Sequence, residues 1–217
     1  MRKASRDQVA ASVRSAPVFG VVRTDSYDAA EGQARAFMEA GLELIEITFS
    51  VPNATSLVSA LLDEADASGP PWIGMGTVTT QERARAALSC GAEFIVSPNI
   101  SDGVARLARD ADRYLLMGGL TATEIVHAWE LGADMVKVYP LGPVGGASYL
   151  SVVRQPLAEI PMLAGGGFGL DEIEEYAEAG ARAFGIGPPM VGPTYEETVR
   201  LARRALELAR RATGASS

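Results

Sequence analysis

Lysine, histidine and cysteine are scarce in this chain of 217 residues, which has two lysines, one histidine and one cysteine. The single cysteine, Cys90, excludes an internal disulfide framework and indicates a reducing compartment. One histidine and one cysteine are too few for a His/Cys metal cluster or a convincing Ser-His or Cys-His dyad. His127 lies in a helix-like stretch and is expected to be structural. The sequence therefore predicts chemistry without a metal or cofactor.

An excess of basic charge and long apolar runs are also missing. The net charge is −8 and the sequence pI is about 4.8, which argues against nucleic-acid and anionic-membrane partners. No stretch has the length of a membrane span or the layout of a signal peptide, so we expect a soluble cytoplasmic protein. The apolar content of 47% is enough for a sizeable core.

The scarcity of lysine draws attention to Lys137, because seventeen arginines carry most of the positive charge. Lys3 belongs to a polar N-terminal tail, whereas Lys137 lies in the apolar run Asp134-Met-Val-Lys137-Val-Tyr-Pro140. A desolvated amine can lose its proton and attack a carbonyl to form a Schiff base, which a guanidinium cannot do. The alternative is a strand lysine that reaches solvent or pairs with a carboxylate.

Short apolar runs alternate with amphipathic segments along the chain, which is typical of parallel strands joined by helices. Eight such units in a chain of 217 residues predict a single (β/α)8 TIM-barrel domain over residues 1–217. A short extra N-terminal helix is expected at 5–15, the barrel strands and helices over 17–190, and a C-terminal helix at 194–212. The predicted strand cores are 18–22, 44–48, 72–75, 94–97, 114–117, 135–138, 161–164 and 183–186.

A fourfold repeat relates the even-numbered strands. Four glycines each end a helix just before such a strand: Gly41, Gly91, Gly132 and Gly180. The fifth residues after these glycines are, in turn, Glu46, Val96, Lys137 and Gly185. Alternate strands of this barrel class supply one layer of four inward side chains. Glu46 and Lys137 are therefore expected in one layer, near the C-terminal face where these barrels carry out chemistry.

An interior glutamate and lysine can form a simple buried ion pair. In the catalytic interpretation, Lys137 is the nucleophile and Glu46 reaches both lysine and substrate through a water. The carboxylate would then move protons during carbinolamine formation, dehydration and carbon–carbon cleavage. The small Gly185 and the medium-sized Val96 would leave room for a substrate between the two long side chains.

Five motifs follow one another along the chain: Leu44-Ile-Glu46-Ile-Thr48, Gly74-Met-Gly76-Thr77-Val78, Val96-Ser97-Pro98-Asn99-Ile100, Val136-Lys137-Val-Tyr-Pro140 and Gly165-Gly166-Gly167. In this order and spacing they resemble the 2-keto-3-deoxy-6-phosphogluconate and 2-keto-3-deoxy-6-phosphogalactonate aldolase family. The Ser97-Pro98-Asn99 and Pro52-Asn53 segments look closer to the phosphogalactonate branch. The resemblance implies a homotrimer of (β/α)8 barrels and metal-free class I aldol chemistry that releases pyruvate through a lysine Schiff base.

The same resemblance implies roles for individual residues. Lys137 would be the Schiff-base lysine and Glu46 the general acid/base. Thr77 would bind the pyruvate-derived part of the substrate through its hydroxyl or its backbone amide. Arg23 matches an arginine that contacts the anionic substrate, although an exposed loop arginine is the alternative. The pocket's rim and floor, or only the local backbone, would be shaped by Pro98 and Pro140.

Two departures from the family pattern concern the substrate's far end. Some members have an arginine four positions after the catalytic glutamate, where this chain has Ser50, as in the phosphogalactonate branch. A phosphate site is expected at the loops after strands seven and eight, where Gly165-Gly166-Gly167 permits close backbone approach. The family usually continues with Gly-Ser after strand eight, whereas this chain reads Gly187-Pro188-Pro189. Proline has neither a hydroxyl nor an amide hydrogen to donate to a phosphate.

The leading hypothesis is a class I aldolase, a carbon–carbon lyase, that cleaves a 2-keto-3-deoxy-6-phospho sugar acid to pyruvate and glyceraldehyde 3-phosphate. Its partner would be this small keto acid. A first alternative is an aldolase for 4-hydroxy-2-oxoglutarate or an unphosphorylated 2-keto-3-deoxy acid. A second is a noncatalytic sugar-acid-binding barrel, suggested only by the Pro188-Pro189 loop. An isomerase or epimerase is disfavoured, because many of these need a His/Asp metal site that one helical histidine cannot build.

Overall fold

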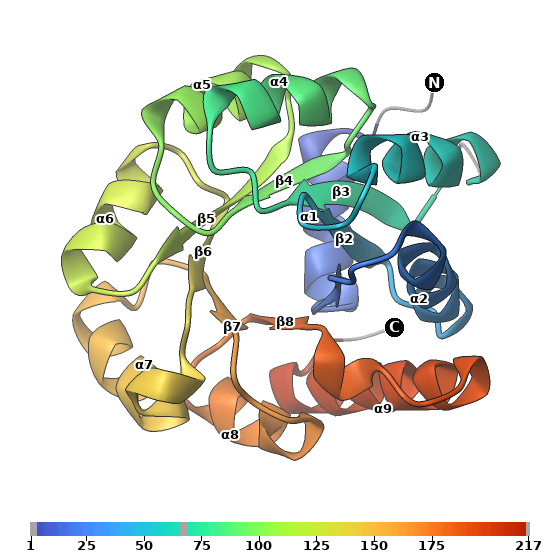
Figure 1. Cartoon of the computed structure of the whole chain (residues 1–217). Helices are drawn as coiled ribbons and strands as arrows, with labels where there is room; N and C mark the ends of the chain where they lie inside the picture. The colour runs from blue at the N-terminus through green and yellow to red at the C-terminus, as the bar shows by residue number, and fades with distance from the viewer. Residues whose placement is uncertain (1–3, 66–68, 216–217) are drawn as a thin grey trace.

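The computed structural model of the chain is a closed barrel of parallel strands that pair in chain order from β1 to β8, with β8 returning to β1. The structure describes residues 4–65 and 69–215, so Lys3 lies outside the described residues. Figure 1 looks into the barrel and shows the strands at the centre with a surrounding ring of helices. The TIM barrel predicted from the alternating pattern is confirmed, as is the helix before the first strand.

The strands begin and end close to the predicted positions. They are β1 Val18–Val22, β2 Leu44–Thr48, β3 Trp72–Gly76, β4 Phe94–Ser97, β5 Tyr114–Gly119, β6 Met135–Val138, β7 Met162–Gly165 and β8 Ala183–Ile186. The predicted ends of β3 and β5 were too early, because the strand pairing continues through the glycines that follow. β7 begins one residue later than predicted, since Pro161 has no amide hydrogen to donate to the ladder.

The helices that connect the strands are α1 Arg6–Ser15, α2 Tyr27–Glu39, α3 Ala54–Glu64, α4 Gln81–Ser89, α5 Asp102–Asp110, α6 Ala122–Glu130, α7 Gly146–Arg154, α8 Ile173–Glu178 and α9 Tyr195–Thr213. Short 3-10 turns are η1 Gly142–Val144, η2 Gln155–Leu157, η3 Leu170–Glu172 and η4 Pro188–Met190. Among the described residues, no helix combines the length and the apolar character needed to cross a membrane.

The four repeat glycines end helices in the left-handed region, with φ of 87°, 92°, 91° and 102°. A side chain there would be strained, so glycine allows each helix to turn directly into the next strand. Each even-numbered strand therefore starts at an equivalent position in the barrel. The third residues after the glycines belong to one buried cluster: Leu44, Phe94, Met135 and Ala183.

Helix α1 covers the N-terminal end of the barrel, behind the strands in Figure 1. Its Val9 and Val13 pack into the same apolar cluster as the inward residues of the strands. The indole nitrogen of Trp72 on β3 donates to Ser12 Oγ at 2.8 Å, which ties the helix to the barrel. Ser5 and Gln8 form a capping box at the start of α1, which satisfies its first amides. This packing leaves the C-terminal end as the side for a polar site.

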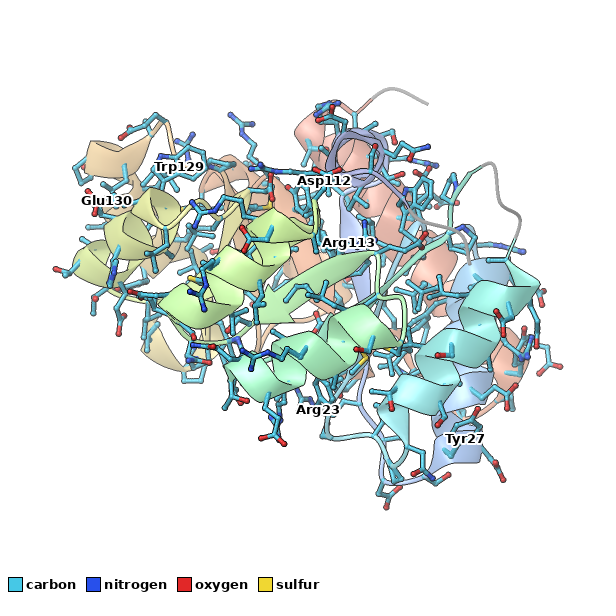
Figure 2. The ribbon with its side chains drawn as sticks, turned by 90° about the horizontal axis from the view of Figure 1, so that it is seen from above. Arg23, Tyr27, Asp112, Arg113, Trp129 and Glu130 are labelled. Atoms are coloured by element: carbon cyan, nitrogen blue, oxygen red, sulfur yellow. The ribbon has the colours of Figure 1, made fainter. Side chains whose placement is uncertain are left out.

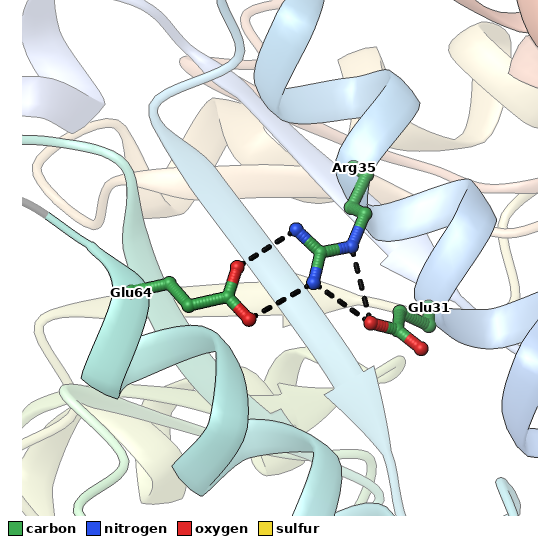
Figure 3. Close-up of polar contacts among 3 residues, drawn as sticks. All are labelled: Glu31, Arg35 and Glu64. Carbon is green, nitrogen blue, oxygen red and sulfur yellow. Dashed lines mark hydrogen bonds and ion pairs between the residues drawn. The ribbon is translucent and has the colours of Figure 1, made fainter.

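Arg35 connects two neighbouring helices on the outside of the barrel (Figure 3). Its guanidinium donates to Glu64 of α3 at 2.8 and 3.1 Å and to Glu31 of its own helix α2 at 2.7 and 3.1 Å. The hydrogen bonds from Arg35 lower the pKa of Glu64 and raise the pKa of Arg35 itself. Because the three side chains are accessible to water, the cluster orients α2 against α3 more than it stabilises the fold.

Candidate active site

Glu46 of β2 and Lys137 of β6 meet inside the barrel. Lys137 Nζ lies 3.5 Å from Glu46 Oε2, and the two side chains are 12% and 2% exposed. The glycine repeat predicted a shared layer for these residues, and the structure places them in contact. A methyl group added at Gly165 would lie 3.2 Å from Lys137 Cε, and one at Gly185 would lie 4.0 Å from it. The absence of side chains at both positions leaves space beside the amine.

Gly76, the last residue of β3, sets the position of the Glu46 carboxylate. A methyl group at Gly76 would lie 2.5 Å from Glu46 Cδ and closer still to Oε1, so only glycine lets the carboxylate lie where it does. Gly76 appears in the Gly-Thr-Val motif, yet no role for this glycine was predicted from the motif. A period of two along a strand predicts which residues face inward, but it does not predict which neighbour an inward side chain lies against.

Arg23 follows β1 and reaches across the mouth of the barrel. Its guanidinium donates to Ser50 Oγ at 3.1 Å and to Thr77 Oγ1 at 3.3 Å, which links the loops after β1, β2 and β3. Ser50 Oγ also lies 2.7 Å from Thr48 Oγ1, whose hydroxyl donates to the Val22 carbonyl at 2.9 Å. Figure 2, a side view of the barrel, shows Arg23 at the opposite end from Arg113, which immediately precedes β5. Arg23 therefore lies at the C-terminal face and is held by hydrogen bonds despite its exposure.

Thr77 adopts a left-handed backbone conformation with φ of 60°, which is rare for a β-branched residue. Arg83, in the first turn of α4, donates to the Thr77 carbonyl at 3.0 Å and to Thr79 Oγ1 at 3.1 Å. The same guanidinium lies 5.4 Å from the centre of the Phe49 ring, so it joins the loops after β2 and β3. These contacts hold Thr77 in its unusual conformation beside Arg23. The sequence contained no signal for Arg83.

Tyr139 borders the site on the side of β7. Its ring would lie 2.6 Å from a methyl group at Gly166, and the ring centre is 5.7 Å from Lys137 Nζ. Gly166 and Gly167 have φ of 77° and 87°, so both amides belong to a tight turn that other residues rarely form. Pro140 follows Tyr139 through a cis peptide bond. This side of the site is therefore built from backbone and one aromatic ring.

A pocket of about 410 Å³ opens between the loops after β7 and β8. Gly185 also lines this pocket, and a methyl group added there would lie 4.0 Å from Lys137 Cε, so one lining residue of the pocket is close to the lysine side chain. The predicted glycines of the phosphate site, Gly166, Gly167 and Gly187, come together here. The complete lining is Gly166, Gly167, Phe168, Gly169, Glu172, Gly185, Ile186, Gly187, Pro188 and Pro189.

Pro98 lies apart from these residues, after β4. Its carbonyl packs against Gly118 of β5, where an added methyl group would collide with it. The neighbouring Ser97 hydroxyl donates to the Asn99 carbonyl at 2.7 Å. Pro98 is half-buried and occupies the rim of the barrel. The structure thus places the predicted loop residues at the C-terminal ends of β1–β3, of β4 and of β7–β8, around the mouth of the barrel.

Comparison with known proteins identifies the family. The family model described as KDPG and KHG aldolase matches residues 9–201 of the chain. The chain belongs to this aldolase family. A 2-dehydro-3-deoxy-phosphogluconate aldolase of Treponema pallidum (strain Nichols) is 31% identical over 159 residues, which cover 73% of this chain and 74% of that protein.

Two further relatives match a larger share of this aldolase chain than the Treponema pallidum protein does. The 2-dehydro-3-deoxy-6-phosphogalactonate aldolase of Escherichia coli (strain K12) is 29% identical over 189 residues, which cover 86% of this chain and 91% of that protein. A solved structure described as native KDPGal matches with a TM-score of 0.83 and 28% identity, covering 91% of this chain and 96% of that one. The family predicted from the five motifs is confirmed, and with it the enzyme class, an aldolase that acts as a carbon–carbon lyase.

Proposed function

We propose that this aldolase cleaves a 2-keto-3-deoxy sugar acid through a Schiff base on Lys137 and releases pyruvate. The observation that supports this most directly is the contact between the Lys137 amine and the Glu46 carboxylate, 3.5 Å apart in the barrel interior. Lys137 is the single lysine among the described residues, and Gly165 and Gly185 leave space beside it.

The reaction starts when the neutral Lys137 amine attacks the C2 carbonyl of the keto acid to form a carbinolamine. Loss of water gives the protonated Schiff base, with Glu46 supplying and removing protons. Glu46 then takes the proton of the C4 hydroxyl as the bond between C3 and C4 breaks. The electron pair of the C3–C4 bond passes to the protonated Schiff base. The aldehyde leaves, the remaining enamine is protonated at C3, and hydrolysis releases pyruvate and the lysine amine.

Arg23 and Thr77 are proposed to bind the anionic and pyruvate-derived parts of the substrate. Their hydrogen bond at 3.3 Å brings a positive charge and a hydroxyl to the C-terminal face, where the keto acid would enter. Pro98 would limit the site on the side of β4. These roles follow the family motif, residue by residue, and the positions of the side chains are compatible with them.

The relatives' names support a 6-phospho sugar acid as the first candidate, with pyruvate and glyceraldehyde 3-phosphate as products. Gly166, Gly167 and Gly187 would then bind the phosphate through their backbone. The second candidate is an unphosphorylated 2-keto-3-deoxy acid or 4-hydroxy-2-oxoglutarate. It is favoured by Pro188 and Pro189 in the wall of the same pocket, since neither has an amide hydrogen to donate.

The remaining proposals concern the assembly and its setting. We propose one barrel domain over residues 1–217 that assembles as a homotrimer in the cytoplasm and acts without a cofactor. The family resemblance supports the trimer, and the single cysteine and the net charge of −8 support a reducing compartment without nucleic-acid partners.

The decisive experiment traps the Schiff base. The protein is incubated with pyruvate and borohydride, and its intact mass and peptide map are compared with those of Lys137→Arg, which keeps the charge. We expect a reduced pyruvate adduct on the peptide that contains Lys137 and none in the variant. Lys137→Ala should also lose cleavage while circular dichroism shows an intact fold. If the folded wild-type protein forms no adduct, the Schiff-base mechanism is wrong and Lys137 forms only a structural ion pair with Glu46. If an adduct forms but no keto-deoxy acid is cleaved, the noncatalytic sugar-acid-binding barrel is favoured.

A further inference from the structure

The pocket between the loops after β7 and β8 is where the far end of the substrate would lie. One of its lining residues, Gly185, is close to the Lys137 side chain, and its volume of about 410 Å³ can hold several carbon atoms with their substituents. The distal carbons of an acid attached to Lys137 at C2 would therefore have this pocket within reach. The chemistry of the pocket wall decides which distal group is accepted.

Charge in this wall has the wrong sign for a phosphate. The described residues that line the pocket include no arginine or lysine, whereas they include the carboxylate of Glu172. Two other lining residues, Pro188 and Pro189, begin the turn η4 and provide no amide hydrogen. A phosphate carries a charge of about −1.5 to −2 at neutral pH, and this wall offers it backbone amides, such as those of Gly166 and Gly167, but no cation.

Glu172 also occupies a donor that an anion could have used. Its Oε2 accepts a hydrogen bond from the Gly169 amide at 2.6 Å, in a capping arrangement at the start of η3. Gly169 itself lines the pocket. One backbone amide of the loop is thus taken by an internal carboxylate, which leaves negative charge at the pocket. A carboxylate in this place can accept hydrogen bonds from hydroxyl groups but repels a phosphate.

We propose that Glu172 is a specificity-determining residue of this aldolase, which disfavours a phosphorylated distal end and favours an uncharged, hydroxylated one. This inference rests on the proposed function, because it concerns the far end of the substrate that Lys137 would hold. It requires no direct part for Glu172 in the reaction at C2, C3 or C4. Changing Glu172 should therefore alter the preference between substrates more than the turnover of the unphosphorylated one.

The test compares one 2-keto-3-deoxy sugar acid with and without its 6-phosphate. The ratio of the two kcat/KM values is measured for the wild type, for Glu172→Gln and for Asp171→Asn. Glutamine keeps an oxygen that can accept the Gly169 hydrogen bond, so the loop should be preserved. Asp171→Asn removes the same charge from the adjacent exposed position, which does not line the pocket.

We expect the ratio to rise about tenfold in favour of the phosphorylated acid in Glu172→Gln, and to do so most strongly at low salt, since Glu172 is exposed. Asp171→Asn should leave the ratio within about twofold of the wild type. An unchanged ratio in Glu172→Gln overturns the proposal, and so does an equal rise in both variants, which would assign the effect to net charge.

A binding measurement separates this inference from the proposed function. If the wild type cleaves neither acid and forms no pyruvate adduct, the aldolase proposal fails by itself. Titration calorimetry with inorganic phosphate still tests the pocket: Glu172→Gln should bind phosphate several-fold more tightly than the wild type and than Asp171→Asn. Equal phosphate affinity in the three proteins refutes the role of Glu172, whatever the catalytic result.

Discussion

Gly76→Ala is expected to disable the aldolase through the position of Glu46. The added methyl group would lie 2.5 Å from Glu46 Cδ, whereas ordinary contacts begin at 3.4 Å. The carboxylate must therefore move by about 1–1.5 Å, because β3 is held by its pairing with β2 and cannot easily shift. This change leaves both Lys137 and Glu46 chemically intact and alters only their relative position.

The expected loss in kcat is about 10²-fold, the typical effect of a displacement of about 1 Å at a reacting centre. Overpacking at this buried position should also lower the free energy of unfolding by about 1–3 kcal/mol. Pyruvate trapping on Lys137 should still occur, although more slowly, because the amine remains. The variant thus separates the placement of the general acid/base from the presence of the nucleophile.

The assay measures pyruvate release, coupled to lactate dehydrogenase, under conditions where circular dichroism shows a folded variant. Gly32→Ala in α2 is the matched control, since its new methyl group would meet nothing within 4 Å. That control should keep wild-type kcat and be at least as stable as the wild type. A folded Gly76→Ala variant with kcat within about threefold of the wild type would refute the placement of Glu46 as a requirement for catalysis.

Two further predictions concern residues outside the Lys137–Glu46 pair. Arg83→Met removes the hydrogen bond to the Thr77 carbonyl and should raise KM by about tenfold, with a smaller change in kcat. Steady-state kinetics measures both constants, and an unchanged KM would contradict a role for Arg83 in positioning Thr77. Hydrogen bonds from the Thr121 and Leu120 amides hold the pKa of the Glu124 carboxyl below its usual 4.5. The ionised carboxylate therefore stabilises the fold above pH 4.5, and this stabilisation is lost as the pH falls through the lowered pKa. Urea unfolding should therefore show Glu124→Gln less stable than the wild type at neutral pH, with a smaller difference well below pH 4.5; a pH-independent difference would contradict the linkage.

The strands and their inward faces could be predicted because they depend on local pattern. Alternating apolar segments located the strand cores within one or two residues, and the glycine repeat fixed the register of the even-numbered strands. That register is sufficient to bring Glu46 and Lys137 together, because the inward side chains of one layer all point toward the axis of the closed barrel. The nucleophile could be chosen by chemistry, because a lysine in an arginine-rich chain is unusual.

The loop contacts around this pair could not be predicted in the same way. In the sequence, Ser50 was noted only because some family members have an arginine at this position. In the structure, its hydroxyl accepts a hydrogen bond from Arg23, 27 residues earlier. Glu172 had no assigned role, because nothing local shows that its carboxylate lines a pocket beside β8. Unlike strand residues, loop residues show no regular alternation along the sequence from which the direction of each side chain could be predicted.

The sequence by itself thus determined the barrel, the layer that joins Glu46 to Lys137 and the family, because each depends on repeating or contiguous residues. The tertiary structure decided how Arg23, Thr77 and Glu172 are arranged around that layer. Parallel strands bring the ends of distant segments to one rim, and the contacts made there depend on loop conformations that only the closed barrel selects.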